Sequence, residues 1–176
     1  MKKFELTNEF ITNMFGTKLF RIRALVEFGD VEAGELGGYV EKESNLGHDD
    51  NAWVYDNAWV YGNARVYGDA QVSGDARVYD NAWVYGDAQV SGDARVYGNA
   101  RVYGNAWVYG NAWVYGNAWV YGNALVCSDE DYAYAHGFGS VNRTTTFFRL
   151  KDGGVGVRCG CFYGTLAQFR DKIRET

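Results

Sequence analysis

Residues 51–80 read NAWVYD NAWVYG NARVYG DAQVSG DARVYD, and this six-residue unit continues with few changes as far as Val126. Valine recurs at every sixth position from Val54, and an alanine stands two residues before each of these valines. A fixed internal period is the sequence signature of a repeat architecture. The repeat therefore predicts a solenoid, and because a solenoid presents one surface many times over, it favours a function in binding.

Each unit is expected to form one short strand and one corner. Glycine with Asn or Asp at every sixth step would break a helix. Alternation about the valine suits a strand in which Val54 points inward while Trp53 and Tyr55 point outward. A pair such as Gly62-Asn63 tolerates left-handed backbone angles and turns the chain. The alanine that follows then fills a space too small for a larger side chain.

Three such sides are expected to make one triangular coil of 18 residues. The block GDAQVSGDARVY occurs at residues 68–79 and again at residues 86–97, a shift of 18 positions. A recent duplication would leave the same shift, so the observation supports the coil length without requiring it. Stacked coils would lie at strand spacing, roughly 4.7–4.9 Å, with valines from all three sides filling the interior.

The spacing resembles the hexapeptide-repeat family, whose pattern asks for an aliphatic residue and a small residue four places later. Val54 with Ala58 and Val60 with Ala64 fit that pattern. The chain departs from it after the aliphatic residue, where it mostly has Tyr. The resemblance implies a mainly β fold, a single-stranded, left-handed parallel β-helix. The left-handed winding comes from the resemblance alone, because periodicity does not fix it.

Both ends of the array are expected to carry caps that cover its open strand edges. Residues 1–50 form the N-terminal β cap, in which alternation predicts a strand over residues 18–28. Val40 and Leu46, six residues apart, begin an imperfect first coil. The insertion at residues 47–50 then resets the register before the β-helix of residues 51–127.

Residues 128–176 are expected to form a C-terminal ββα cap. The stretches TTTFFRL and VGVRCGCFY flank a Lys-Asp-Gly-Gly turn, which predicts a hairpin. Thr165 and Gln168 match a capping box at the start of a helix. Leu166, Phe169 and Ile173 share one face of that helix, which we expect to pack on the hairpin or over the last coil.

The two ends also resemble a group of phage and prophage hexapeptide-repeat proteins over nearly the full length. The matching stretches are FRIRALVEFGDVEAGELGGYV at residues 20–40 and TTTFFRLKDGGVGVRCGCFYGT at residues 144–165. By analogy with phage accessory proteins, the resemblance implies a mobile-element protein that binds and blocks a host protein complex. The target class it implies is bacterial defence, such as the Cas nuclease of a CRISPR effector.

Composition indicates the cellular compartment of the protein and the classes of partner that are disfavoured. A net charge of −5 argues against direct binding of nucleic acid. No apolar run is long enough for a membrane span, and the first residues lack the pattern of a signal peptide. Three cysteines suit a reducing compartment. We therefore expect a protein of the bacterial cytoplasm that needs no membrane.

Acyl transfer, the activity of many hexapeptide-repeat proteins, is the main enzymatic alternative. It usually needs a histidine that projects from a coil and a loop that encloses the substrate. The array contains neither, and the histidines lie outside it at His48 and His136. We expect no catalytic residues and no cofactor, with acyl transfer through one of these histidines and a purely structural scaffold as alternatives.

Four side chains, Cys127, His136, Cys159 and Cys161, match the types that hold zinc. A Cys-X-Cys step is tighter than the usual ligand spacing, however. On one strand Cys159 and Cys161 would face the same side, so burial against the helix also explains them. We expect buried free thiols and no metal.

The outward positions of the array are the candidate protein-binding surface, because exposed aromatic area of this extent usually marks an interface. Tyrosines form two vertical ladders, all six tryptophans take outward positions, and aspartates occupy corners. Stacking that only stabilises the coils, or a turn that only needs an aspartate, explains the same residues. A homodimer or other homo-oligomer would also cover them. The candidates are Tyr61, Tyr79, Tyr97, Tyr115, Tyr67, Tyr85, Tyr103, Tyr121, Trp107, Trp113, Trp119, Asp69, Asp75, Asp87 and Asp93.

Overall fold

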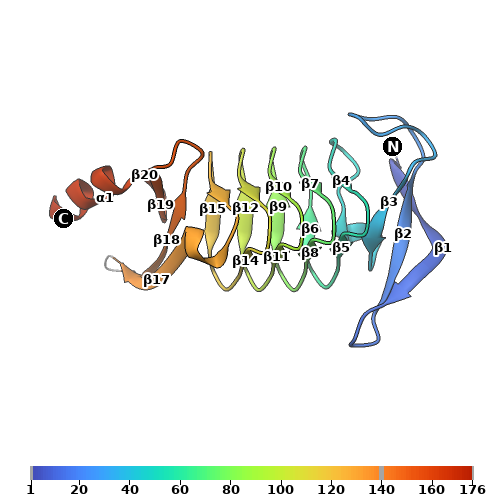
Figure 1. The fold of residues 1–176 in the computed structure, drawn as a ribbon, viewed down its shortest axis with the longest axis horizontal. Coiled ribbons are helices and arrows are strands. Elements are labelled where there is room, and N and C mark those ends of the chain that lie inside the picture. The colour runs from blue at the N-terminus through green and yellow to red at the C-terminus, as the bar shows by residue number, and fades with distance from the viewer. Residues whose placement is uncertain (1, 139–140, 176) are drawn as a thin grey trace.

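The computed structural model describes residues 2–138 and 141–175, which form a parallel β-solenoid with a cap at each end (Figure 1). Each coil takes 18 residues, since Val54 pairs in register with Val72 and Val60 pairs with Val78. The predicted coil length and the mainly β architecture are confirmed. The three sides of the coils are three parallel sheets.

We number these sides as faces 1, 2 and 3 in chain order. Face 1 consists of β4 (Trp53–Val54), β7 (Gln71–Val72), β10 (Gln89–Val90), β13 (Trp107–Val108) and β16 (Leu125–Val126). Face 2 contains β5 (Trp59–Val60), β8 (Arg77–Val78), β11 (Arg95–Val96) and β14 (Trp113–Val114). Face 3 is built from β6 (Arg65–Val66), β9 (Trp83–Tyr85), β12 (Arg101–Tyr103) and β15 (Trp119–Tyr121).

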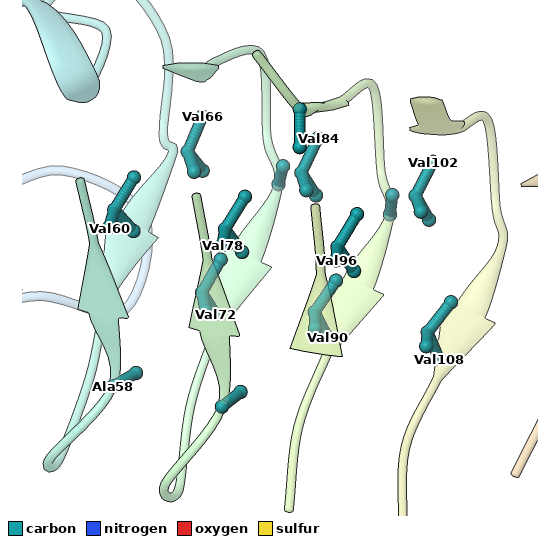
Figure 2. Packing of buried hydrophobic residues seen from close by; sticks show 14 of the residues in the cluster. Ala58, Val60, Val66, Val72, Val78, Val84, Val90, Val96, Val102 and Val108 are labelled. Carbon is teal, nitrogen blue, oxygen red and sulfur yellow. The ribbon is translucent and has the colours of Figure 1, made fainter. Parts of the chain in front are cut away.

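The interior is a column of valines, as predicted. Every repeat valine from Val54 to Val126 is 0 % exposed, and the repeat alanines are buried beside them. Valines of all three faces point toward a common axis (Figure 2). The core is therefore one side chain deep on each side and continuous along the solenoid.

The corners depend on left-handed backbone angles. Gly68 has a φ of +71°, and a Cβ at this position would lie 2.9 Å from the nitrogen of Gly86 in the next coil. Glycine is therefore required by conformation and by stacking distance together. Asp56 and Asp80 replace glycine at two corners and keep positive φ values of 52° and 59°.

The N-terminal cap is an antiparallel sheet that continues face 2. It consists of β1 (Phe4–Thr12), β2 (Lys18–Ala24) and β3 (Leu36–Val40), followed by the 3₁₀ turn η1 (Glu43–Asn45). Strand β3 pairs in parallel with β5, so face 2 and the cap form one seven-stranded sheet. The strand predicted over residues 18–28 ends early, at Ala24, because its pairing with β3 is irregular there and the chain bends away.

The imperfect first coil is present. Val40 pairs with Val60, and Leu46 bridges to Val66, so both residues enter the valine column. Leu46 and Val54 are eight positions apart, whereas successive valines of the repeat are six positions apart. The predicted insertion therefore allows the chain to reach face 1 and begin the regular repeat.

The C-terminal cap has four strands rather than two. It contains η2 (Asp129–Asp131), β17 (Tyr132–Phe138), β18 (Arg143–Arg149), β19 (Val155–Cys159), β20 (Phe162–Thr165) and α1 (Leu166–Arg174). The predicted hairpin at residues 151–154 joins β18 and β19. The stretch expected to be its second strand is broken by Gly160, with a φ of +59°, into β19 and β20.

Helix α1 begins at the predicted capping box, where the nitrogen of Gln168 donates to Thr165 Oγ1 at 3.3 Å. Phe169 is buried against Phe138, Phe147 and Phe162 of the cap sheet. Leu166 and Ile173 remain exposed, so only the centre of the predicted helix face is buried. No helix in the described part of the chain is long and apolar enough to cross a membrane.

The two caps satisfy opposite backbone groups at the ends of the solenoid. Coil N–H groups donate toward the C-terminal end, for example from Trp53 to the carbonyl of Ala70. Open carbonyls at the first coil are therefore met by donors, and Lys3 Nζ donates to Ala52 O at 2.8 Å. Open N–H groups at the last coil are met by acceptors, and Trp113 N donates to Asp129 Oδ1 at 2.7 Å.

Candidate binding surfaces

The predicted tyrosine ladders exist on faces 2 and 3. On face 2 the ring centroids of Tyr61, Tyr79, Tyr97 and Tyr115 lie 5.1, 4.9 and 5.4 Å apart. On face 3 the separations along Tyr67, Tyr85, Tyr103 and Tyr121 are 4.9, 4.8 and 4.4 Å. These distances follow from the spacing of stacked strands.

Stacking determines which parts of the tyrosine rings a partner can contact. Within a ladder each ring covers the face of the next, so a partner meets mainly ring edges and hydroxyl groups. Burial raises the pKa of Tyr79 to about 12, and it raises the pKa of Tyr85 as well. The hydroxyls of Tyr79 and Tyr85 are therefore neutral hydrogen-bond donors at physiological pH.

A second column on face 2 holds tryptophan and arginine. The Arg77 guanidinium lies 4.2 Å from the ring centroid of Trp59, and that of Arg95 lies 4.7 Å from Trp113. Arg77 and Arg95 are adjacent in register. Within residues 2–138 and 141–175 no carboxylate lies within ion-pair distance of either arginine. Face 2 therefore presents two positive charges held by aromatic rings.

The turn between β1 and β2 overhangs face 2. Met14 and Phe15 at its tip are 87 % and 81 % exposed. The turn is held by Asn13 Oδ1, which accepts from the nitrogens of Phe15 and Thr17 at 3.0 and 2.9 Å. Turn and face enclose a cleft of about 420 Å³, lined by Thr12, Asn13, Met14, Phe15, Trp59, Tyr61, Arg77, Tyr79 and Arg95.

Sequence reasoning missed this cleft. The sequence feature that could have indicated it is the pair Met14-Phe15 beside Gly16, which places two large apolar side chains on a turn. Nothing in the sequence shows that the turn lies over the solenoid. That placement follows from the pairing of β1 with β2 and of β3 with β5, which joins segments far apart in the chain.

Face 1 differs in charge from face 2. Its outward positions at mid-height are Gln71, Ser73, Gln89 and Ser91. Two exposed columns of aspartate border it, made by the predicted candidates Asp69 and Asp87 at one corner and Asp75 and Asp93 at the other. Asp69 Oδ1 accepts from Asn51 Nδ2 at 2.8 Å, so at least this carboxylate also serves its corner. Face 1 is therefore polar at mid-height and has aspartates along both corners, and it shares the corner of Asp75 and Asp93 with face 2.

The tryptophans do not form one cluster. Trp107, Trp113 and Trp119 share a coil but lie on faces 1, 2 and 3, so they point in three directions. Trp107 and Trp113 are exposed, whereas Trp119 is half-buried. Trp53, predicted at an outward position, is nevertheless 0 % exposed because Phe4 and Phe28 of the N-terminal cap pack on it.

The histidines have different surroundings. His48 stacks on Phe4 at 4.3 Å and accepts a hydrogen bond at Nδ1 from the nitrogen of Lys3. Burial lowers the pKa of His48. His48 is therefore engaged in the packing of the N-terminal cap. His136 is exposed on β17, where its Nδ1 makes a 2.8 Å hydrogen bond with Thr144 Oγ1.

The cysteines are not uniformly buried, and this part of the expectation is wrong. Cys161 is exposed in the turn between β19 and β20, and Cys127 and Cys159 are half-buried. Cys127 Sγ lies 2.8 Å from Asp131 Oδ2, and this hydrogen bond raises the pKa of the thiol. Among the residues that the structure describes, no three His, Cys, Asp or Glu side chains gather as metal ligands.

One protein-family model, the YdcK β-solenoid repeat, matches the chain in six segments. The matched residues are 58–72, 70–86, 88–102, 94–110, 100–116 and 108–122. All six lie within the array, so the similarity supports the β-solenoid and leaves both caps outside it. No curated protein matches the sequence.

Proposed function

We propose that the protein is a non-catalytic binding protein that holds a segment of a partner protein in the cleft between the β1–β2 turn and face 2. The observation that carries this proposal is the exposure of Met14 and Phe15 over Trp59, Tyr61 and Arg77. Large apolar side chains on a firmly held turn favour an interface, because covering them removes apolar area from water.

The composition of the cleft supports a protein partner. Tyr, Trp, Arg and Met are enriched in protein interfaces, and buried Tyr, Trp and Arg often supply most of the binding free energy. Stacked ladders and stacked arginines have little side-chain freedom left to lose on binding. A rigid surface of this kind suits tight and selective association.

The charges of the cleft indicate the chemistry of the partner segment. Arg77 and Arg95 lack carboxylate partners in the described structure, so an acidic side chain of the partner would pair with them. An apolar side chain next to it would cover Met14 and Phe15. The proposed partner segment therefore combines acidic and apolar residues.

The identity of the partner is the part of the proposal that rests on resemblance. Similarity to phage and prophage proteins implies a host protein complex of the bacterial cytoplasm, for example a Cas effector or another defence assembly. On this account the protein blocks its target by occupying a surface. A second copy of the chain, which would place the aspartates along face 1 against the arginines of face 2, is the competing occupant.

Co-purification with tagged variants tests the proposal. The wild-type chain serves as bait in bacterial lysate, beside Phe15→Ser and Arg77→Gln variants. Gln already occupies the position of Arg77 in other units, at Gln71 and Gln89, so Arg77→Gln is expected to fold. Each change is expected to weaken capture of the same stoichiometric partner by roughly tenfold or more, since interface hot spots contribute about 2 kcal/mol or more.

Matched controls lie on other surfaces. Val141→Ser removes an exposed apolar side chain from the C-terminal cap, and Arg65→Gln removes an arginine from face 3. Both are expected to capture the partner like the wild type. Equal capture by all five baits would contradict the proposed cleft. Light scattering of the purified protein separates a second copy from a different partner.

A further inference from the structure

A second hollow lies where face 3 meets the C-terminal cap, away from the cleft on face 2. Its volume is about 390 Å³. Three arginines from separate parts of the chain border it, and no carboxylate does. The lining residues are Asn99, Arg101, Asn117, Trp119, Arg143, Thr144, Arg158 and Gly160.

Trp119 holds two of these arginines in place. The guanidinium of Arg101 lies 4.9 Å from the indole centroid, and that of Arg158, on β19, lies 5.3 Å from it. A planar guanidinium stacked on a ring still directs its N–H groups sideways, in its own plane. Trp119 therefore fixes two positively charged forks at the edge of the hollow.

Arg158 carries an unsatisfied donor. Its Nε is buried and has no hydrogen-bond acceptor in the described structure. Its Nη1 donates to Phe162 O at 3.4 Å, near the upper limit for a hydrogen bond. Within residues 2–138 and 141–175, Arg101, Arg143 and Arg158 have no ion-pair partner. Three cations that border one hollow, one of them with a buried unmet donor, favour an anion among them.

Arg143 reaches this place because the turn beneath it is glycine. A Cβ on Gly160 would lie 2.8 Å from both Cδ and Nη1 of Arg143. The arginine therefore lies directly over the bare backbone of the β19–β20 turn. A larger residue at position 160 would push Arg143 aside as well as strain a φ of +59°.

Neutral donors complete the hollow. An asparagine ladder runs from Asn63 through Asn81 and Asn99, each Nδ2 donating to the Oδ1 of the next, and it ends at Asn117. The Nδ2 of Asn117 has no further asparagine of the ladder to donate to. The Thr144 hydroxyl also borders the hollow.

We propose that this hollow binds a phosphate dianion, either free phosphate or the phosphate group of a small monoester. A compact group with three outward oxygens matches several convergent guanidinium forks, which bind phosphate in bidentate fashion. The indole of Trp119 already packs against two guanidinium groups, those of Arg101 and Arg158. The proposal is therefore for the phosphate group itself, bound by the guanidinium groups.

Titration calorimetry at constant ionic strength tests this site, with inorganic phosphate and glycerol phosphate as separate probes. The wild type is expected to bind one equivalent with a saturable isotherm. Arg101→Gln and Arg158→Gln are each expected to weaken binding by roughly tenfold or more, the loss expected for charge-assisted hydrogen bonds. Tighter binding of glycerol phosphate would identify a monoester, and equal or tighter binding of inorganic phosphate would identify the free ion.

Arg65→Gln is the matched control. Arg65 occupies the same position of the repeat and also lies over a tryptophan of the next coil, Trp83, but it is two coils away from Arg101 and outside the hollow. The Arg65→Gln variant removes the same charge and is expected to leave phosphate binding unchanged. Equal weakening by Arg65→Gln and Arg101→Gln would overturn the proposal, since net charge alone would then explain the effect. The absence of saturable binding by the wild type would overturn it too.

Discussion

At the scale of single residues, each position of the repeat has one structural role, which restricts the residue types that fit there. Valine is stiff at its first side-chain torsion and fits a pleated strand, so it fills the axis without extra freedom. Alanine fits beside the corner, and glycine or aspartate takes the left-handed angle of the turn. The outward positions are free to vary, which is where the chain places Trp, Arg, Gln, Tyr and Ser.

Val84→Asp is expected to collapse the solenoid. Val84 is fully buried in the middle of the valine column, and a carboxylate there would have no partner. An unpaired buried charge costs more than about 3–5 kcal/mol, comparable to the stability of a whole domain. Circular dichroism and urea unfolding measure the loss. Val84→Ala, the control, is expected to stay folded and lose about 1–3 kcal/mol.

The tyrosine ladder is expected to be dispensable for folding. Replacing both Tyr79 and Tyr97 by Ser removes three stacked pairs, those with Tyr61 and Tyr115 included. Ser73 and Ser91 already occupy the equivalent position on face 1. We therefore expect the double variant to fold with a loss of about 1–3 kcal/mol. If it unfolded, the ladder would be a structural requirement rather than a modest contribution.

At the scale of elements, the two ends of the solenoid resemble the two ends of a helix, because each end leaves one type of backbone group without a partner. One end exposes carbonyls and is covered by donors, and the other exposes N–H groups and is covered by acceptors. Lys3 and the Asn45 amide serve the first end. Asp129 and Thr146 serve the other. Each cap therefore fits only its own end.

Lys3 makes this arrangement sensitive to pH. Burial lowers the pKa of Lys3 to about 8, from an ordinary value near 10.5. Between these two values the unfolded chain binds more protons than the folded one, so the free energy of unfolding is expected to rise with pH. Urea unfolding between pH 7.5 and 9.5 measures the rise.

Two variants isolate the contribution of Lys3. Lys3→Met is expected to lose the rise, whereas Lys2→Met, which removes an exposed lysine, is expected to keep it. A rise that persists unchanged in Lys3→Met would show that another group is responsible.

Elements that follow a local pattern were predictable from the sequence, and those set by distant contacts were not. The valine period, the glycine corners and the Thr165 cap are local, and all three are confirmed. β1 shows no clean alternation, and its place depends on pairing with β2. The break between β19 and β20 was missed because Cys159-Gly160-Cys161 sits inside an otherwise strand-like run.

Among the candidate surfaces, too, those set by the local repeat were predictable and those set by distant contacts were not. The register predicted the ladders correctly, since stacking depends only on the 18-residue period. The cleft under Phe15 and the hollow around Arg158 were missed because each joins a cap to a face. Burial of Trp53 was missed for the same reason, since a cap and not the repeat covers it.

At the scale of the whole molecule, repetition gives three long faces and the caps make them different. Face 1 is polar at mid-height with aspartates along its corners, face 2 joins stacked tyrosines and arginines to the overhanging β1–β2 turn, and face 3 ends in the arginine hollow. A rod with distinct sides suits a protein that occupies another protein's surface along its length. The proposed function therefore depends on face 2.

Site-specific photocrosslinking in bacterial cells tests this claim most directly. A photoreactive phenylalanine replaces Phe15 in one variant and Gln89, on face 1, in another. We expect a single crosslinked adduct between a partner protein and the chain labelled at position 15, and none from position 89. An adduct from position 89 with none from position 15 would contradict the account, because the binding side would then be face 1.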